Sequence, residues 1–354
     1  MAAPFDLWDQ AVVTDLIYRP LTTQWEDNPR LGDLIAPVQE IQARVAKVRT
    51  AQTLAFGIGQ FKAPGATPRL YKADQAWQES IIELALLEEA ERIDDETWLR
   101  LNSNDEVVRR AAGVDLVTRG RILALRNERL TEWMRWQAFL NGNLTISYEQ
   151  GQTDLFIDYG YTATHLVTLS TLWSDTTNGD PVTDMRAWSA VLAKDSGYFG
   201  TKFHMSSDTF DLIVRNAKVR AYLTATNRSM LIPTMQDILT LLREGSSIVI
   251  YDNGYRADTV GTARGIPDNL TRFLPKGKVL VTTDYSIEGT NIAETLDGQV
   301  LVTSGWNQID IRQGPQSEML IDPFSKTHYF RQASSRMVRL LYPECFLSAY
   351  VSAP

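Results

Sequence analysis

The sequence predicts an α+β protein, and three observations support this prediction. A proline-free stretch of about 36 residues lies between Ser103 and Asn141, enough for one long helix. Strand and turn patterns occur on both sides of this stretch. Beyond Pro181, helix and strand patterns alternate along the chain, which indicates a second, α/β lobe.

The composition is that of a globular protein with a substantial core. Of the 354 residues, 44% are hydrophobic and 22% are charged, and no obvious linker divides the chain, so we expect one or two closely associated domains. The formal charge of -8 argues against a protein that grips nucleic acid tightly, because phosphate binding requires clustered Lys and Arg. Cys345 is the single cysteine and cannot form an intramolecular disulfide, which indicates a reducing compartment.

No segment predicts a membrane anchor or an export signal. The chain has no uninterrupted apolar run near the roughly 20 residues that a membrane-spanning helix needs. Near the start, Asp6, Asp9 and Asp15 occupy the region where a signal peptide would have a basic segment followed by an apolar one. We therefore expect no membrane partner.

Residues 1–40 predict an extended arm. Apolar anchors such as Phe5 and Trp8 are interspersed with Pro20, Pro29 and Pro37, which discourage any long regular element. We therefore expect this segment to pack on another surface.

Residues 41–74 predict a two-stranded ribbon with a loop at its tip. Apolar and polar residues alternate from Ile41 to Ala46, the period of a half-buried strand. A Gly- and Pro-rich stretch follows, and Leu70 and Tyr71 suggest a return strand. Because an isolated ribbon is marginally stable in water, we expect the ribbon and the arm to gain order on neighbouring copies.

The segment from Gln75 to Arg92 predicts a helix with an acidic face. Acidic side chains far outnumber arginine between Glu79 and Glu96. Such a run is more often a solvated helix face than a surface for a partner, and we favour that interpretation.

A long helix is predicted next, bounded by a capping box at Ser103 and Glu106 and by a stop signal at Asn141-Gly142. Gly113 and Gly120 weaken it and permit bending or close packing. The apolar stripe expected to face the core comprises Val107, Ala111, Val114, Ile122, Leu125, Trp133, Trp136 and Leu140.

The remaining elements follow in a mixed order. A strand, turn and strand are predicted around residues 150–152, and then helices and strands alternate. The predicted strands are 144–148, 155–159, 166–173, 247–251, 255–260 and 278–283, and the predicted helices are 184–195, 207–222 and 234–244.

The sequence contains no motif that assigns a catalytic, cofactor or metal site. Gly57-Ile58-Gly59 has Lys62 where a dinucleotide fingerprint needs its third Gly, and Gly277-Lys278 is followed by Val279 instead of Ser or Thr. Neither pattern opens a helix, so both are interpreted as turns. Three further candidates are interpreted as structural: the separate histidines (His165, His204 and His328), the apolar Cys345 and the run Asp94 to Glu96.

Several short patterns occur in a familiar order. They are the long helix running into Phe139-Leu140-Asn141-Gly142-Asn143, the segment from Trp173 through Pro181 to Trp188, Phe273-Leu274-Pro275, and the closing Tyr342-Pro343-Glu344-Cys345-Phe346. In this order the chain resembles the lambda-like major capsid protein E family of tailed phages, which has the Hong Kong 97-like fold. The likeness covers nearly the whole chain.

The resemblance implies five segments and a set of interface residues. The implied segments are an N-terminal arm (1–40), an extended loop (41–74), a peripheral domain with a spine helix (75–180), an axial domain (181–312) and a return to the peripheral domain (313–354). Residues expected at subunit interfaces are Gly57, Gly59, Phe61, Pro64, Gly65, Arg69, Tyr71, Arg109 and Arg110. No Lys and Asn pair can be assigned to the covalent crosslink of the founder of the fold.

The resemblance also implies a function and partners. Copies of the chain would form hexamers and pentamers of an icosahedral shell around double-stranded DNA, assembled in the host cytoplasm. Portal and scaffolding proteins would be partners, and a decoration protein is a further one. Two alternatives stay open: the shell of a cellular nanocompartment, and an α/β enzyme that uses His204, Asp252 and Asp284.

Overall fold

The structure is a computed structural model, and it divides the chain into two compact units. The first unit comprises Met1–Val48, Ile81–Arg135 and Glu294–Arg339, and the second comprises Arg49–Ser80, Trp136–Ala293 and Leu340–Pro354. The residues described are 10–27, 30–51, 77–146, 155–225, 233–255, 271–304, 308–322 and 327–352.

The longest element is helix α4 (Glu106–Asn141), which confirms the predicted long helix. Its start differs in detail from the predicted capping box. The Asp105 carboxylate accepts a hydrogen bond from the Val107 amide at 2.9 Å, while Ser103 Oγ accepts from the Asp105 amide. Asp105 therefore caps the helix in place of Ser103, because its carboxylate lies nearer to the free amides. At the other end, Gly142 has a φ of +66°, which ends the helix as predicted.

The prediction of which face of α4 meets the core is wrong along the first half of the helix. Val107, Val114 and Ile122 are 78%, 59% and 54% exposed. The buried face lies on the other side of the helix and carries Ala112, Leu116, Val117 and Ala124. Since both faces carry apolar residues, helical periodicity alone could not tell which one meets the core.

Helix α1 (Gln10–Asp27) covers part of this buried face, which corrects the prediction of an extended arm. Pro20 lies inside α1 without ending it. Val13, Ile17 and Leu21 are buried against α4 and Phe330 of the same chain, so apolar packing outweighs the proline penalty. The described residues of this arm therefore find a packing surface within their own unit, and the short helix α2 (Leu31–Ile35) follows.

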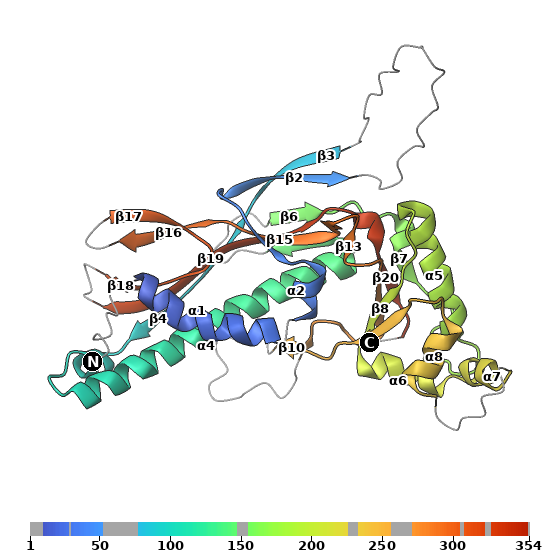
Figure 1. Cartoon of the computed structure of the whole chain (residues 1–354), viewed down its shortest axis with the longest axis horizontal. Helices are drawn as coiled ribbons and strands as arrows, with labels where there is room; N and C mark the ends of the chain where they lie inside the picture. Colours follow the sequence, from blue (N-terminus) through green and yellow to red (C-terminus); the bar gives the residue numbers. More distant parts are fainter. Residues whose placement is uncertain are drawn as a thin grey trace, which may run out of the picture. The chain divides into compact units, whose positions relative to one another are not determined.

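A five-stranded sheet lies beside α4 in the first unit (Figure 1). Its path is β1-β15-β19-β18, and β4 also pairs with β19. These strands span Val38–Glu40 (β1), Ala293–Asp297 (β15), His328–Leu340 (β19), Gln316–Ile321 (β18) and Ala85–Ile93 (β4).

The helix predicted over Gln75 to Arg92 is wrong, because β3 (Trp77–Glu83) and β4 occupy this segment. Leu84, Leu87 and Ile93 are buried. Nine residues of β4 run antiparallel to β19, from Ile93 opposite His328 to Ala85 opposite Arg336. This long-range pairing outweighs the helix propensity of a Leu-, Ala- and Glu-rich segment.

Two further pairs of strands lie wholly or partly within the first unit. β2 (Val45–Ala51) pairs with β3, so the observed partner strand lies beyond the predicted ribbon of residues 41–74, and β16 (Gln299–Ser304) pairs antiparallel with β17 (Gln308–Gln313). The predicted return strand at Leu70 and Tyr71 lies outside the described residues.

The second unit is built on a mixed five-stranded sheet of order β7-β20-β12-β8-β9 (Figure 1). β12 is antiparallel to both of its neighbours, whereas β20 with β7 and β8 with β9 are parallel pairs. The strands are Leu166–Thr168 (β7), Phe346–Tyr350 (β20), Lys278–Thr282 (β12), Lys202–Met205 (β8) and Ser247–Ile250 (β9).

Helices pack on this sheet and enclose the core of the second unit. Trp173 stacks on Trp188 at a ring distance of 5.6 Å, and Phe203, Val281 and Leu347 are buried in the same cluster. The helices are α5 (Pro181–Ser196), α6 (Ser207–Arg215), α7 (Ala217–Ala225) and α8 (Met235–Leu241).

Most predicted elements of this unit are confirmed, with one helix divided in two. The predicted helix 207–222 breaks at Asn216, whose backbone is extended. The Asn216 side-chain oxygen accepts hydrogen bonds from the Lys218 and Val219 amides and so caps α7. Because asparagine is a favourable helix cap, Asn216 was the signal in the sequence for a break between two helices.

The remaining described elements are short. They are α3 (Asp95–Leu101), β5 (Asn143–Ile146), β6 (Leu155–Asp158), β10 (Gly254–Tyr255), β11 (Thr271–Arg272), β13 (Ser286–Ile287), β14 (Thr290–Asn291) and the 3-10 turns Ala163–His165 and Pro343–Cys345. None of the described helices is both long and apolar enough to span a membrane.

Candidate assembly surfaces and buried charge networks

The ribbon β2–β3 is the base of the loop in which most interface residues are predicted. Seven of these residues lie outside the described part of the chain, namely Gly57, Gly59, Phe61, Pro64, Gly65, Arg69 and Tyr71. Their role at an interface stays a prediction.

Arg109 and Arg110 lie on the first turns of α4 and are exposed. Neither guanidinium forms an ion pair with another described residue, in contrast to Arg119 and Arg126 farther along the helix. Two exposed cations that pair with no carboxylate in the described part of the chain are available for a further contact.

The acidic strand β4 is engaged in ion pairs with arginines of its own unit. Glu89 accepts two hydrogen bonds from Arg126, at 2.8 and 2.9 Å. Arg331 of β19 lies 2.5 Å from Glu88, and Arg119 lies 3.3 Å from Glu91. The acidic run therefore joins β4 to α4 and β19. Neither a solvated face nor a partner-binding patch, the two interpretations offered from the sequence, describes this arrangement.

A buried network of charges centres on Arg336 of β19. Its guanidinium donates to Glu128 of α4 at 2.5 Å and to Asp297 of β15 at 3.0 Å. Burial opposes the ionisation of Arg336, but the attraction of Glu128 and Asp297 outweighs it and raises the pKa of Arg336. Burial also raises the pKa of Asp297, against the attraction of Arg336. The pairing allows three ionisable side chains to be buried between a helix and a sheet.

A second network holds α2 to α4 and β15. Arg135, fully buried, pairs with Asp33 and lies 3.3 Å from Glu132, and its Nε donates to Thr295 at 2.8 Å. Glu132 also accepts a hydrogen bond from the Gly32 amide at 3.1 Å. Together these contacts fix the segment after α1 within the first unit, although the sequence offered only isolated Arg and Glu positions as a signal.

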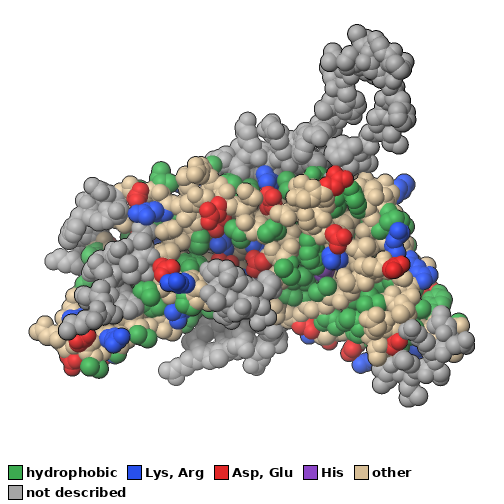
Figure 2. Space-filling view, viewed as in Figure 1, with side chains coloured by type: hydrophobic (Ala, Val, Ile, Leu, Met, Phe, Trp, Pro, Cys, Tyr) green, Lys and Arg blue, Asp and Glu red, His purple; other side chains and the backbone are tan. Residues whose placement is uncertain are grey.

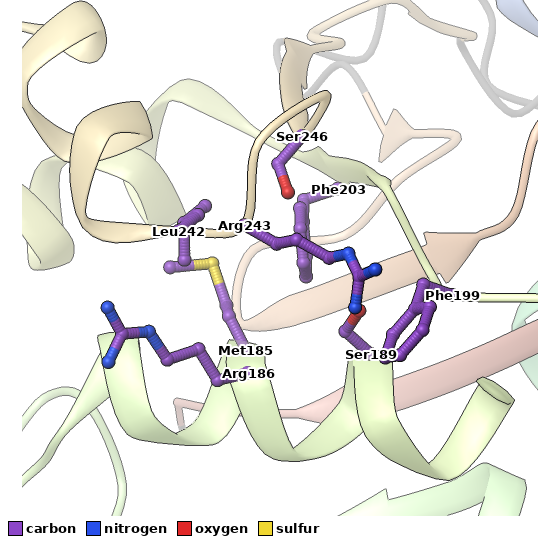
Figure 3. A pocket seen from close by; sticks show the side chains of 8 residues that line it. All are labelled: Met185, Arg186, Ser189, Phe199, Phe203, Leu242, Arg243 and Ser246. Carbon is purple, nitrogen blue, oxygen red and sulfur yellow. The ribbon is translucent and has the colours of Figure 1, made fainter. Parts of the chain in front are cut away.

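The second unit contains a hollow with a cavity volume of about 400 Å³, lined by both apolar and polar side chains (Figure 3). Two of its polar side chains have partners: Ser189 Oγ donates to the Gly200 carbonyl at 2.7 Å, and Arg186 donates to the Leu241 carbonyl. The Arg243 guanidinium lies over the Phe199 ring at 3.4 Å from its centroid. The lining residues are Met185, Arg186, Ser189, Phe199, Phe203, Leu242, Arg243 and Ser246.

The enzyme alternative requires His204, Asp252 and Asp284 to face a common substrate, and their contacts differ. His204 is fully buried and its Nε2 lies 3.2 Å from Thr282 Oγ1. Asp252 accepts from the Ser207 amide at 3.0 Å, and Asp284 pairs with Lys202 at 3.3 Å. Each of the three side chains thus contacts a different partner, and none of these contacts joins one of the three to another.

The other candidates for chemistry also have structural partners. Cys345 is buried, and burial raises the pKa of its thiol to about 12, which disfavours the reactive thiolate. Asp94 caps α3 by accepting from the Thr97 amide at 3.1 Å. Among the described residues, no three His, Cys, Asp or Glu side chains are grouped as metal ligands.

Comparisons with known proteins agree with a structural role. The sequence profile described as phage major capsid protein E matches residues 71–307. No curated protein matches the chain.

Two solved structures share the fold. A putative capsid protein of a prophage of E. coli CFT073 has a TM-score of 0.57 and 13% identity, with 95% of this chain and 99% of that chain covered. A phage-related protein of Bordetella bronchiseptica RB50 has a TM-score of 0.54 and 15% identity, with 94% and 96% covered.

The fold is thus that of the phage capsid proteins. Because the family profile covers about two thirds of the sequence, the chain belongs to the phage major capsid protein E family, and the predicted resemblance is confirmed.

Proposed function

We propose that this chain is the major head protein of a tailed phage and that its copies form the hexamers and pentamers of an icosahedral shell around double-stranded DNA. Membership in the phage major capsid protein E family is the observation that carries this proposal. The implied division into arm, extended loop, peripheral domain and axial domain is part of the same proposal.

Physical features of the described residues support assembly through surfaces. The ribbon β2–β3 pairs only two strands, and a two-stranded ribbon is marginal unless another surface supports it. Arg109 and Arg110 are exposed without a described ion-pair partner, and apolar side chains on the outer face of α4 are exposed as well. Head-to-tail contacts between copies close into rings when the rotation permits.

The charge of the chain suits a container that does not hold its contents tightly. The net charge is -8, and basic and acidic side chains are interspersed on the face seen in Figure 2, outside the grey regions. Duplex DNA would therefore be enclosed without specific binding, since affinity for phosphates needs clustered cations. Portal and scaffolding proteins, and a decoration protein, are the further partners in this proposal, with assembly in the host bacterial cytoplasm.

Electron microscopy of the chain expressed in bacteria tests the proposal. We expect closed particles with five-fold and six-fold capsomers at every concentration above an assembly threshold. Particles isolated from the native host that contain a cargo enzyme and no nucleic acid would favour the nanocompartment alternative. A protein that stays monomeric would contradict both kinds of shell.

A further inference from the structure

The outer face of the β16–β17 hairpin exposes large apolar side chains in cross-strand register. Leu301 lies opposite Ile311, and Thr303 lies opposite Ile309. Leu301, Ile311 and Ile309 are 41%, 58% and 75% exposed. Because directly opposite residues of a hairpin share one face, these side chains form a single exposed apolar patch.

The alternation of β17 is inverted relative to a strand that covers a core. Asp310 and Arg312 occupy its other face, since they lie opposite Val302 and Val300, which are buried. In a sheet with one buried face, the apolar positions point to the core and the charged positions to water. On β17 the isoleucines point outward, as expected of a strand whose outer face is covered by a further surface.

The hairpin is fixed in this orientation by its own unit. The Leu301 carbonyl accepts a hydrogen bond from Arg331 at 3.2 Å, and the Thr303 amide donates to Glu318 at 2.6 Å. Val300, Val302 and Ala333 form a small apolar cluster on the inner face. Turning the isoleucines inward would break these contacts, so the hairpin keeps the patch exposed as far as the described residues of the chain are concerned. Figure 1 shows β17 as the outer strand of the hairpin.

We propose that this patch (Leu301, Thr303, Ile309 and Ile311) packs against the same patch of a second copy of the chain. The patch carries no charge, and only the glutamines Gln299 and Gln313 border it in the described register, so two copies meet without repulsion. An uncharged apolar face is complementary to itself, which is what contact between identical surfaces requires.

The size of the patch fits a repeated contact within an assembly. A stable two-protein interface uses roughly 20–30 residues on each side, far more than this patch supplies. The contact therefore does not hold a free dimer and acts together with other contacts between copies. In this respect it rests on the proposed function, which supplies those contacts.

A lysine substitution at both isoleucines tests the need for the patch. We expect the double variant Ile309→Lys/Ile311→Lys to yield at least tenfold fewer particles than the wild type, as measured by sedimentation. Both side chains are exposed, so its thermal unfolding should match that of the wild type. Wild-type particle yield in this variant would refute the proposal.

Cysteine crosslinking tests the geometry directly. In oxidised particles, Ile309→Cys or Ile311→Cys should give a disulfide-linked dimer, because identical positions approach within the roughly 7 Å that a disulfide tolerates between Cα atoms. The control Leu86→Cys, 39% exposed on β4, should give none, and the native Cys345 is buried. Particles in which neither cysteine crosslinks would refute the hairpin contact alone, whereas a wild type without particles would refute the proposed function.

Discussion

At the scale of single residues, charge burial organises the first unit. Arg336 and Arg135 are both almost inaccessible, and each is neutralised by two acidic groups from separate elements. Removing one member of such a network leaves the remaining charged groups buried with neither a counter-ion nor hydration, which destabilises the fold. The exposed pair of Arg126 and Glu89 lacks this sensitivity, because water replaces the lost partner.

Arg336→Ala should therefore lower the free energy of unfolding by about 3–5 kcal/mol, since Glu128 and Asp297 lose their counter-ion. The matched control Arg126→Ala should cost at most about 1 kcal/mol. Urea unfolding followed by circular dichroism measures both. Equal losses for the two variants would contradict the importance that we assign to the buried network.

His204 should make the second unit sensitive to acid. Its burial, and then the charge of Lys202, lower its pKa from 6.5 to about 3. Between these values the unfolded chain binds a proton that the folded chain does not, so stability falls as the pH falls from 6.5 toward 3. The loss from this residue approaches about 1.4 kcal/mol per pH unit.

The His204→Gln variant tests this link because it cannot take up the proton. Its unfolding free energy should depend less steeply on pH within that window, and the slope above pH 7 should be unchanged. An unaltered slope between 6.5 and 3 would show that His204 is not the acid-sensitive group.

At the scale of elements, α4 shows how close packing depends on a missing side chain. A Cβ atom at Gly120 would lie 2.6 Å from the Phe330 ring and 2.7 Å from the Ile17 methyl group, so α1 and β19 approach the helix there. At Gly113 nothing lies within 4 Å of the same position. The sequence allowed bending or close packing at both glycines, and the structure shows close packing at Gly120 only.

These glycines provide a matched pair of substitutions. Gly113→Ala should stabilise the protein by up to about 1 kcal/mol, the gain in helix propensity. Gly120→Ala should destabilise it by about 1–3 kcal/mol, because overpacking exceeds that gain. Thermal unfolding of the two variants should shift in opposite directions, and a shift in the same direction would contradict the packing of α1 on α4.

Elements with local signals could be predicted, and those decided by distant partners could not. Asn141-Gly142 marks the end of α4, and the helix predicted from Thr234 starts there, with Thr234 as its N-cap. The strand β4 has no comparable local signal, since its pairing with β19 joins residues more than 200 positions apart. Pro20 favoured the prediction of an extended arm where α1 forms, because tertiary packing decides whether a helix tolerates an internal proline.

At the scale of the whole molecule, the family could be predicted from the order of elements, whereas the assembly surfaces could not. Periodicity identifies an apolar face but does not say whether the chain or a neighbour covers it, as Val107 and Ile309 show with 78% and 75% exposure. Of the predicted interface residues, the structure describes Arg109 and Arg110 and finds them exposed. The hairpin patch was missed, although the alternation of Ile309, Asp310, Ile311 and Arg312 was its signal.

The central claim is that this chain functions through contacts with its own copies. Sedimentation velocity of the purified protein over a wide concentration range tests it most directly. The account predicts monomers or small rings below a threshold and a sharp boundary of large, uniform particles above it, because many weak contacts form together. A single monomer boundary at every concentration and salt condition would contradict it.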